Sequence, residues 1–306
     1  MDGASKGYTS TRLGIVPRAR EFAALLALYR QNSAALVGRS IAQVTEVLDE
    51  IAELQGHPVI DRDILEIGSG QKSIQLAVMN MQNRAIGIDR ESSSGDLDIR
   101  YLVRTVKTDG FMRASKTVAR KIFGIDRVIR EECCRQLDLD NWPVLNIIQM
   151  DASNMSFPDD SYDVVFSRAV FEHIADPAAV LREIARVLRR GGVFYCLLHL
   201  YTSYSGCHDA RILSGHSGDM PLWAHLREQH KHRIVENTYL NRLRLSEWQR
   251  IFRDAMPGVR VHALMDDTNT THRAELCELR NTGELTDYSD EEVLTVTLKA
   301  VWQRDS

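Results

Sequence analysis

A glycine turn near a carboxylate is the first sign of a ligand site. The run EIGSG (66–70) lies between a β-rich segment (63–68) and a segment suited to a helix (72–80). Glycine permits a tight turn and lets a ligand approach the backbone closely. Asp89 ends the next β-rich segment, about 20 residues further on, where a carboxylate can accept both hydroxyls of a ribose. Together these features predict an adenosine-containing cofactor.

A nicotinamide or flavin dinucleotide is the alternative ligand for such a turn. Its fingerprint, G-x-G-x-x-G/A, requires glycine or alanine where this chain has Ser73. Asp151 ends another β-rich segment (144–151), where its carboxylate can accept a hydrogen bond from an adenine amino group. The next backbone N–H, at Ala152, can donate to the adenine ring. A dinucleotide enzyme has no comparable need for this spacing, so the sequence favours a different cofactor.

The elements that would position these residues alternate between strands and helices. β-rich segments are expected at 63–68, 85–89, 144–151, 162–167 and 193–200, and helices at 72–80 and 177–192. Such alternation predicts right-handed βαβ units in a doubly wound sheet. A helix at 245–256, with Ser246 as its cap, and closing strands at 258–265 and 293–302 follow. We therefore expect an α/β fold, a Rossmann-like seven-stranded mostly parallel sheet with helices on both faces.

Three parts of the chain lie outside this alternation. Residues 1–58 contain two helical patterns, at 18–30 and 39–54, and should form an N-terminal helical cap. The insertions 96–140 and 201–244 are too long for simple connections. Ligands bind at the carboxyl edge of such sheets, so both insertions should form the substrate side.

Composition limits the class of protein. Hydrophobic residues at 44% and charged residues at 26% are ordinary for a globular cytosolic protein. The formal net charge of −4 disfavours nucleic acid as a partner. The five cysteines contain no C-x-x-C, which indicates reduced thiols rather than disulfides or a zinc site. No stretch approaches the ~18 apolar residues of a membrane span, and the first residues lack the features of a signal peptide. A cytoplasmic protein without a membrane span is expected.

Four stretches resemble the class I S-adenosylmethionine-dependent methyltransferases, specifically their type 11 small-molecule branch. The stretches are LEIGSGQ, GIDR, MDASNMSFPDDSYDVVFSRAVFEHIADP and EIARVLRRGGVF. They lie between Ile64 and about Leu200, a little under half of the chain. One departure is Lys72, which replaces the third glycine common in this family's first motif. The resemblance implies a single methyltransferase domain over residues 1–306, with S-adenosylmethionine as its cofactor.

The resemblance also implies cofactor contacts at matching positions. Asp89 would hold the ribose, and Asp151 with Ala152 would recognise the adenine. Ser167 and Arg168, expected just past the fourth strand, would lie beneath the methionine part of the cofactor. The full set of implied cofactor residues is Glu66, Gly68, Ser69, Gly70, Asp89, Arg90, Asp151, Ala152, Ser167 and Arg168.

Three histidines are candidates for a catalytic base. A sulfonium methyl group is already activated, so the protein mainly aligns the nucleophile, but an oxygen nucleophile also needs a base. His199, at the end of the fifth strand, is preferred over His173, which follows the fourth strand, and over His208 in the next insertion. His208 and Asp209 together are candidates for an oriented base pair or part of a metal site. Their spacing matches no firm metal motif, so no metal is expected.

The acceptor remains open at this level. The leading hypothesis is O-methylation of a small molecule, glycan or lipid-linked sugar. N- or C-methylation of a natural product and a non-catalytic, S-adenosylmethionine-binding regulatory protein are the alternatives. Methylation of nucleic-acid bases is disfavoured because SRAV, not N/D-P-P-Y/F, follows the fourth strand. Trp223, Trp248 and Trp302 are more often core residues than substrate contacts, and Trp223 is the one to test as a sugar or ring contact. Basic residues of the first insertion form either an anion-binding wall or a solvated helix face: Arg113, Lys116, Arg120, Lys121, Arg127 and Arg130. The sequence does not indicate an oligomeric state.

Overall fold

The computed structural model describes residues 15–70, 72–90, 125–213, 218–236, 238–265 and 268–305. The chain divides into two compact units, Met1–Met150 and Asp151–Ser306.

The first unit contains three parallel strands. β2 pairs with β1 on one side and with β3 on the other. Ile67, at the end of β1, lies opposite Ile88, so the carboxyl ends of β1 and β2 are neighbours. The elements of this unit are α1 (Ile15–Gln55), β1 (Asp63–Ile67), α2 (Ile74–Met79), β2 (Arg84–Asp89), α5 (Ile125–Leu137) and β3 (Asn146–Gln149). Strand order β3-β2-β1 places the glycine turn beside the end of the central strand.

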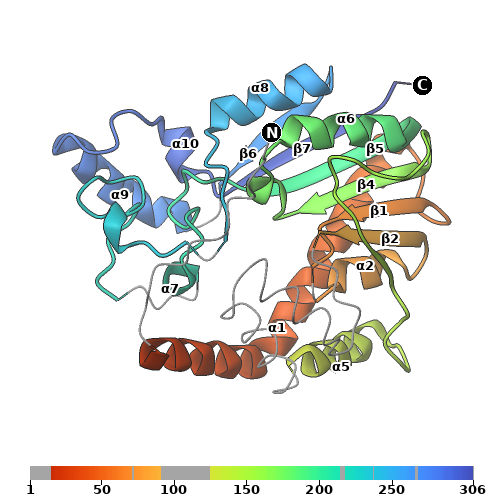
Figure 1. The fold of residues 1–306 in the computed structure, drawn as a ribbon, viewed down its shortest axis with the longest axis horizontal. Helices are drawn as coiled ribbons and strands as arrows, with labels where there is room; N and C mark the ends of the chain where they lie inside the picture. The colour runs from red at the N-terminus through yellow and green to blue at the C-terminus, as the bar shows by residue number, and fades with distance from the viewer. Residues whose placement is uncertain are drawn as a thin grey trace, which may run out of the picture. The chain divides into compact units, whose positions relative to one another are not determined.

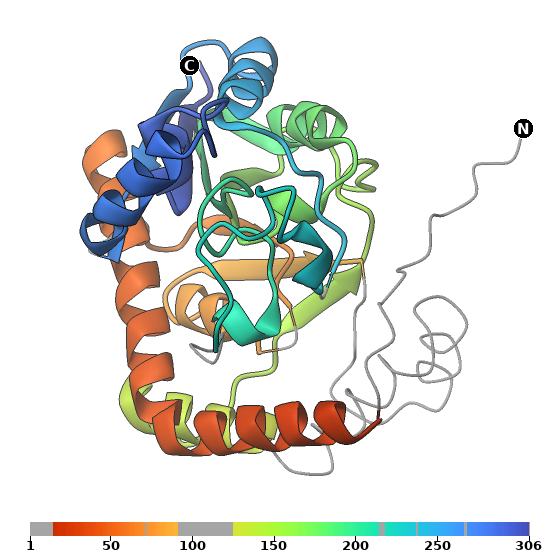
Figure 2. The ribbon, with the colours of Figure 1, turned by 90° about the vertical axis from the view of Figure 1, so that its left-hand side faces the viewer.

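One long helix replaces the two that the sequence predicts before the first strand. α1 is continuous over 41 residues and bends along its length (Figure 2). The prediction of two helices is wrong because no proline interrupts residues 31–38. Gly38 does not end the helix either, since α5 packs closely against α1 at this residue. A Cβ at Gly38 would lie 3.2 Å from Oε1 of Gln136. Nε2 of Gln136 also donates to the carbonyl of Ala34 at 2.9 Å, which ties α5 to the side of α1 (Figure 1).

The second unit contains four strands in the order β4-β5-β7-β6. β4 and β5 are parallel, while β7 is antiparallel to both β5 and β6. α6 and α8 lie side by side in this unit (Figure 1). Its elements are β4 (Tyr162–Arg168), η1 (Phe171–His173), α6 (Pro177–Val187), β5 (Leu188–His199), α7 (Ala210–Leu213), η2 (Lys231–Arg233), α8 (Leu245–Ala255), β6 (Arg260–Leu264), α9 (Thr268–Asn281), α10 (Asp290–Leu294) and β7 (Thr297–Gln303).

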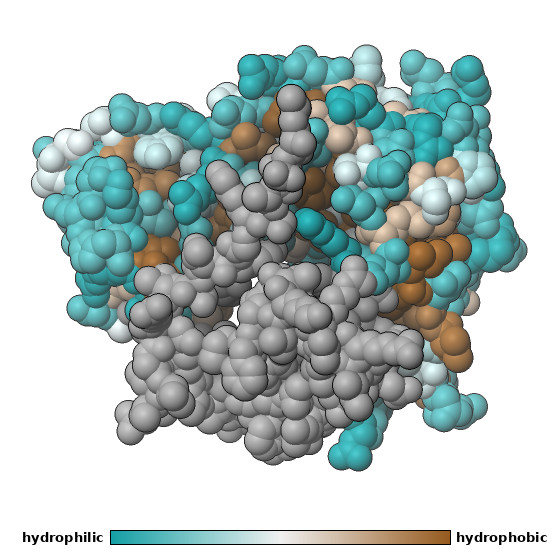
Figure 3. Space-filling view, viewed as in Figure 1, coloured by the Kyte–Doolittle hydropathy of each residue, from teal (hydrophilic) through white to brown (hydrophobic). Residues whose placement is uncertain are grey.

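The predicted fold class is confirmed. The chain has a seven-stranded, mostly parallel sheet with helices, closed by the expected antiparallel pair β6 and β7. On the face shown in Figure 3 the described surface is mostly hydrophilic, with smaller hydrophobic areas between. None of the helices in the described ranges combines the length and the apolar composition needed to cross a bilayer.

The glycine pair after α6 belongs to a strand rather than to a helix end. The helix predicted over 177–192 stops at Val187, and β5 begins at Leu188 with extended backbone angles. Leu188 pairs with Tyr162, but the register shifts before the next pairs, which indicates a bulge. Gly191 has a φ of 73°, a conformation that favours glycine. The two glycines therefore shape an irregular strand start.

The structure also decides the cap of α8 and the surroundings of Trp223. α8 begins after Arg244, whose N–H donates to the carboxylate of Glu247 at 2.8 Å, so Ser246 is not the cap. Trp223 is only 1% exposed, and its indole N–H donates to the carbonyl of Val293 at 3.1 Å. Trp223 thus belongs to a hydrophobic core with residues of α9 and α10, which favours a core role over a ring contact with a substrate.

The basic residues of the first insertion are only partly described. Arg127 is exposed and pairs with Glu131 at 3.6 Å, as expected for a solvated helix face. The guanidinium of Arg130 lies over the ring of Trp142, 5.6 Å from its centroid. The remaining four, at positions 113, 116, 120 and 121, lie outside the described residues.

Candidate active site

The first unit places the glycine turn directly against Asp89. Gly68 and Gly70 have φ values of 75° and 60°, which explains the need for glycine at both positions. The N–H of Gly68 donates to the carbonyl of Ile88 at 2.8 Å, and the N–H of Gly70 donates to Oδ2 of Asp89 at 2.9 Å. Asp89 therefore holds the turn in shape from the end of the neighbouring strand.

Two further residues support this turn, Gly87, which was not singled out from the sequence, and Ser73. A Cβ at Gly87 would lie only 2.7 Å from Oγ of Ser69, so a side chain on β2 would displace the turn. Ser73 precedes α2 with a φ of 50°, and its hydroxyl donates to the carbonyl of Gly70 at 3.0 Å. A glycine inside a β-rich segment was the available signal for the first of them. Glu66 and Ser69 are buried, whereas Arg90 is exposed.

The second unit contains the remaining implied cofactor residues. Oδ1 of Asp151 accepts the backbone N–H of Ser153 at 2.9 Å and its hydroxyl at 2.7 Å, which closes a turn that also contains Ala152. Ser167 and Arg168 belong to β4 itself, not to the segment after it, and Ser167 is fully buried. Their expected position just past the strand is wrong because β4 continues pairing with β5 through Arg168.

A tight turn at the end of β4 projects a carboxylate and an imidazole. Ala169 has a φ of 53°, and a single 3-10 turn, η1, follows it. Phe171 anchors this turn in the core, since its ring packs against aromatic rings of β5 and α8. Nδ2 of Asn241 donates to the carbonyls of Phe171 at 2.9 Å and Ile174 at 3.0 Å. Glu172 and His173 are thus held by contacts from a distant part of the chain.

Successive turns after β5 bring His208 back toward the end of that strand. The N–H groups of Ser203, Gly206 and His208 each donate to the carbonyl three residues earlier, at 3.1 Å. A Cβ at Gly206 would overlap the carbonyl oxygens of Leu200 and Tyr201, so only glycine fits there. This compact loop leaves His208 with a φ of 53°, a conformation uncommon for a residue with a side chain.

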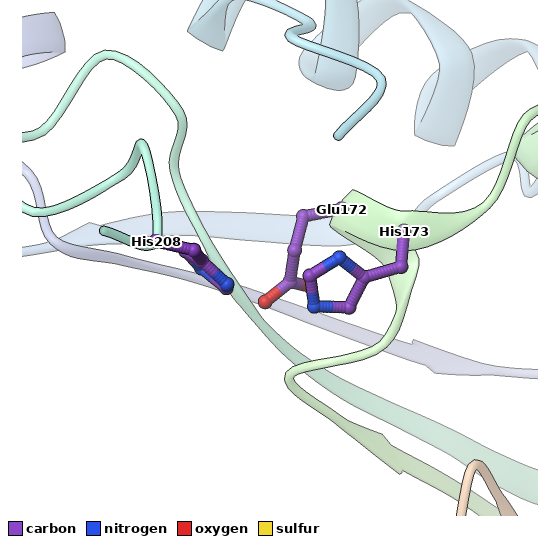
Figure 4. A group of neighbouring side chains, drawn as sticks. All are labelled: Glu172, His173 and His208. Atoms are coloured by element: carbon purple, nitrogen blue, oxygen red, sulfur yellow. The ribbon is translucent and has the colours of Figure 1, made fainter. Parts of the chain in front are cut away.

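The three predicted histidines converge with a carboxyl group that the sequence analysis missed. We call Glu172, His173, His199 and His208 the histidine cluster. Nε2 of His208 lies 3.0 Å from Nδ1 of His199, and the ring centroids of His173 and His208 are 5.0 Å apart. The side chains of Glu172, His173 and His208 point toward one another (Figure 4). The FEHI run contained the signal for Glu172, a carboxylate directly before a candidate histidine.

Further polar groups orient the rings of the histidine cluster. Nδ1 of His173 lies 2.8 Å from the carbonyl of Tyr239, which can only accept, so this nitrogen bears a proton. Nε2 of His199 lies 3.0 Å from Oγ of Ser205 and 3.2 Å from Oγ of Ser203. Both serines are buried. These contacts restrict the rotation of two rings and select the tautomer of His173.

Burial favours the uncharged forms of two members of the cluster, Glu172 and His208. Burial raises the pKa of the Glu172 carboxyl to about 8, although the backbone N–H groups of Glu172 and His199 favour its charged form. Burial also lowers the pKa of His208 to about 3, and the neighbouring rings of His199 and His173 lower it further. His208 is therefore a neutral imidazole at neutral pH.

Asp209 does not orient His208. Its Oδ1 accepts the backbone and Nε donors of Arg211, at 3.0 and 2.9 Å, and its Oδ2 accepts the N–H of Val235 at 2.9 Å. These bonds engage both oxygens of the carboxylate. The suggested base pair of His208 with Asp209 is wrong because the aspartate serves to fasten the loop.

A buried histidine beside the cluster makes the second unit sensitive to acid. Nε2 of His225 donates to the carbonyl of Tyr201 at 2.8 Å, and burial lowers its pKa to about 4. The backbone bond to Tyr201 opposes this shift, while the charges of His199 and Arg242 add to it. The unfolded chain therefore takes up this proton first, and stability is lost as the pH falls below about 6.5.

His225→Gln is expected to reduce this acid sensitivity. Between pH 7 and pH 5 the loss of unfolding free energy should be smaller in the variant by about 2 kcal/mol, because glutamine cannot take up a proton but can still donate to Tyr201. Urea unfolding at both pH values measures the difference. His262→Gln, at an exposed position on β6, serves as the control. Equal losses in wild type and His225→Gln would contradict the assignment.

Comparison with known proteins identifies the type of domain. Residues 108–196 match the family model described as a methyltransferase domain. The Bacillus subtilis protein named Uncharacterized methyltransferase YcgJ is 29% identical over 101 residues, 33% of this chain and 33% of that protein. Phosphatidylethanolamine N-methyltransferase of Cereibacter sphaeroides is 37% identical over 57 residues, 19% of this chain and 28% of that protein. The Mycobacterium tuberculosis protein named Probable S-adenosylmethionine-dependent methyltransferase Rv3030 is 29% identical over 103 residues, 34% of this chain and 36% of that protein.

Solved structures of methyltransferases cover more of the chain at low similarity. Bacillus subtilis YcgJ superimposes with a TM-score of 0.39 at 16% identity, covering 88% of this chain and 99% of that one. Haemonchus contortus phosphoethanolamine N-methyltransferase 2, in complex with S-adenosylmethionine, gives a TM-score of 0.45 at 15% identity. The match covers 85% of this chain and 53% of that one. Similarity at these TM-scores carries no further inference.

The matches confirm the resemblance stated from the sequence. Residues 108–196 match a methyltransferase domain, and the relatives include a protein named a probable S-adenosylmethionine-dependent methyltransferase. The matched residues 108–196 include Glu172 and His173 but neither the glycine turn nor His199. The chain spans only 28% to 36% of the length of the three relatives, so their activities apply to those proteins alone.

Proposed function

We propose that this protein transfers the methyl group of S-adenosylmethionine to a hydroxyl group of a small molecule, glycan or lipid-linked sugar. The observation that carries the proposal is the convergence of three imidazoles and a buried carboxyl group after β4 and β5. A hydroxyl acceptor has a high pKa and needs a group that removes its proton, which unprotonated imidazole can do.

Cofactor binding is assigned to the residues that match the methyltransferase motifs. Asp89 would accept the ribose hydroxyls, and the turn with Glu66, Gly68, Ser69 and Gly70 would surround the methionine part. Asp151 and Ala152 would recognise the adenine, with Arg90, Ser167 and Arg168 as further contacts. The φ values of the glycines and the bond from Gly70 to Asp89 support this assignment, because they fix the turn in a shape open to a ligand.

The reaction balances without a further reactant. A lone pair of the acceptor oxygen attacks the methyl carbon while the C–S bond breaks, and its electron pair stays on sulfur. S-Adenosylmethionine becomes S-adenosylhomocysteine, and the hydroxyl proton passes to an imidazole of the histidine cluster and then to solvent. The sulfonium is already activated, so positioning and proton removal are the protein's main contributions.

N-methylation is the second candidate, because one relative is named a phosphatidylethanolamine N-methyltransferase. An amine that becomes a cationic ammonium product is best stabilised by anionic or aromatic groups. Burial lowers the pKa of His208 in this cluster to about 3 and raises the pKa of its Glu172 carboxyl to about 8, so both groups are uncharged at neutral pH. This charge balance favours a hydroxyl over an amine as the acceptor.

Calorimetric titration with S-adenosylmethionine, S-adenosylhomocysteine and NADH tests the cofactor assignment. Binding of the first two, without NADH, is the expected result. A turnover assay then compares hydroxylated acceptors, such as sugars and phenols, with phosphatidylethanolamine. Methylation of phosphatidylethanolamine alone would replace the proposal with N-methylation, and binding without any turnover would favour the non-catalytic alternative.

His199→Ala and His173→Ala are expected to lower turnover of a hydroxyl acceptor by about 10²- to 10⁴-fold, as loss of acid–base catalysis does. Their affinity for S-adenosylmethionine should stay within about threefold of wild type, since neither residue is assigned to the cofactor. His262→Ala, at an exposed position on β6, is the control and should retain full turnover. Loss of cofactor binding in either cluster variant would instead place that histidine in the cofactor site.

A further inference from the structure

We infer that the histidine cluster binds a divalent transition-metal ion, with Glu172, His173 and His208 as its protein ligands. Binding of the ion is independent of the proposed function, whereas its role in activating an acceptor hydroxyl rests on that function.

Distances between the potential ligand atoms support the site. One atom each from Glu172, His173 and His208 lies within 4.8 Å of the others. Zn²⁺ bound at about 2.0–2.1 Å in a tetrahedron requires ligand atoms about 3.3 Å apart. Small side-chain rotations close this difference, because the three groups already point toward a common centre (Figure 4).

The buried carboxyl group of Glu172 independently indicates a missing cation. Its side chain is 2% exposed, and Oε2 is buried with no hydrogen-bond partner among the residues that the structure describes. Oε1 accepts a long bond, 3.3 Å, from the N–H of His199. Burying a carboxyl group with so few partners is unfavourable, and a cation at the centre would offset that cost.

The outer contact of His173 matches that of metal ligands in proteins, and the ring of His208 is also held in place. A metal-bound histidine usually donates its other ring N–H to a carbonyl, carboxylate or similar group, which fixes the ring. Nδ1 of His173 donates to the carbonyl of Tyr239 at 2.8 Å, which leaves Nε2 as its ligand atom. The ring of His208 is held through its contact with His199, which is itself held by Ser205.

Two imidazoles and one carboxylate select the kind of ion. Mg²⁺ and Ca²⁺ prefer sets of oxygen ligands, whereas imidazole suits zinc, iron and other first-row transition metals. Two histidines with a glutamate also form the protein ligand set of catalytic zinc sites that keep one position for water or substrate. Zn²⁺ is therefore the ion to test first.

An ion at this place would activate the acceptor directly. A hydroxyl oxygen in the remaining position would be bound to the ion, which lowers the pKa of the hydroxyl as it does for bound water. The O–H bond would then break before methyl transfer, with the proton passing to His199, the histidine of the cluster outside the ligand set, and then to solvent. The oxygen lone pair forms the bond to the methyl carbon as the C–S bond of the cofactor breaks.

Metal titration of the chelator-treated full chain tests the site. Calorimetry with Zn²⁺ and visible absorption with Co²⁺ should both saturate at one ion per chain in wild type. Glu172→Gln and His208→Gln are expected to weaken binding by about 100-fold or more, because each removes a ligand. His199→Gln should weaken it by about 10- to 100-fold, as loss of an outer contact does. His225→Gln, a buried histidine outside the ligand set, is the matched control and should bind as wild type does.

Circular dichroism and S-adenosylmethionine affinity show whether each variant is folded. Failure of wild type to bind either ion would overturn the inference, as would equal binding by wild type, Glu172→Gln and His208→Gln. Turnover that persists in the metal-free protein would overturn only the role of the ion. Metal binding without methyl transfer to any acceptor would instead count against the proposed function and leave the metal site in place.

Discussion

Replacing Asp89 with alanine is expected to weaken binding of S-adenosylmethionine by about 100-fold or more. Two charge-assisted hydrogen bonds to the ribose are each worth about 1.5–3 kcal/mol. The substitution also removes the acceptor of the Gly70 N–H, which lies 2.9 Å from Oδ2 of Asp89. The glycine turn then loses a contact that holds it in shape before the cofactor arrives, so preorganisation is lost as well. Calorimetric titration with S-adenosylmethionine measures the change.

Asp63→Ala is the matched control for this prediction. Asp63 begins β1, at the end of the strand opposite to the glycine turn, and its carboxylate pairs with Arg84 at 2.6 Å. The Asp63→Ala substitution also removes a carboxylate, but from the strand next to β2 and far from the glycine turn, so the affinity for S-adenosylmethionine should change little. Asp89→Asn keeps an acceptor for the Gly70 N–H but loses the charge. Its affinity for S-adenosylmethionine should lie between those of Asp89→Ala and Asp63→Ala. Equal affinities in wild type and Asp89→Ala would remove Asp89 from the cofactor site.

Gly206→Ala is expected to disrupt the loop that holds His208, with a loss of unfolding free energy of about 3 kcal/mol or more. The added Cβ would overlap the carbonyl oxygens of Leu200 and Tyr201. These are backbone atoms just after β5, so no side-chain rotation can relieve the overlap. The turn bonds of Gly206 and His208 would open, and the histidine cluster would lose one of its rings. Urea unfolding measures the stability, and turnover measures the site.

Gly258→Ala is the control for the Gly206 substitution. Gly258 has a φ of 82° and nothing within 4 Å of an added Cβ. The Gly258→Ala substitution should lower the unfolding free energy by only about 1 kcal/mol, because a residue with a side chain is disfavoured at left-handed backbone angles. Turnover should stay intact. A Gly206→Ala protein as stable and active as Gly258→Ala would show that the loop can rearrange, and the placement of His208 would then need revision.

Elements with strong local patterns were predictable from the sequence. The strands ending at Ile67 and Asp89, and the antiparallel closing pair, follow from apolar runs bounded by glycine and acidic residues. Predictions failed where the same short sequence pattern occurs in two different kinds of structure. Glycines 191 and 192 are typical of a helix end, yet here they form the irregular start of β5. The uninterrupted helix α1 depends on packing against α5. The sequence pattern within residues 18–54 carries no information about this contact with a distant segment.

The amino-acid sequence by itself determined the sheet and the glycine turn beside Asp89. Backbone preference and hydrophobic periodicity act over a few residues, so those features are complete within short segments. Only the tertiary structure decided that His173, His199 and His208 surround Glu172. Their meeting depends on contacts between distant segments, such as Asn241 against η1. Burial, which makes Glu172 a potential metal ligand rather than a solvated acid, arises only when those segments pack around it.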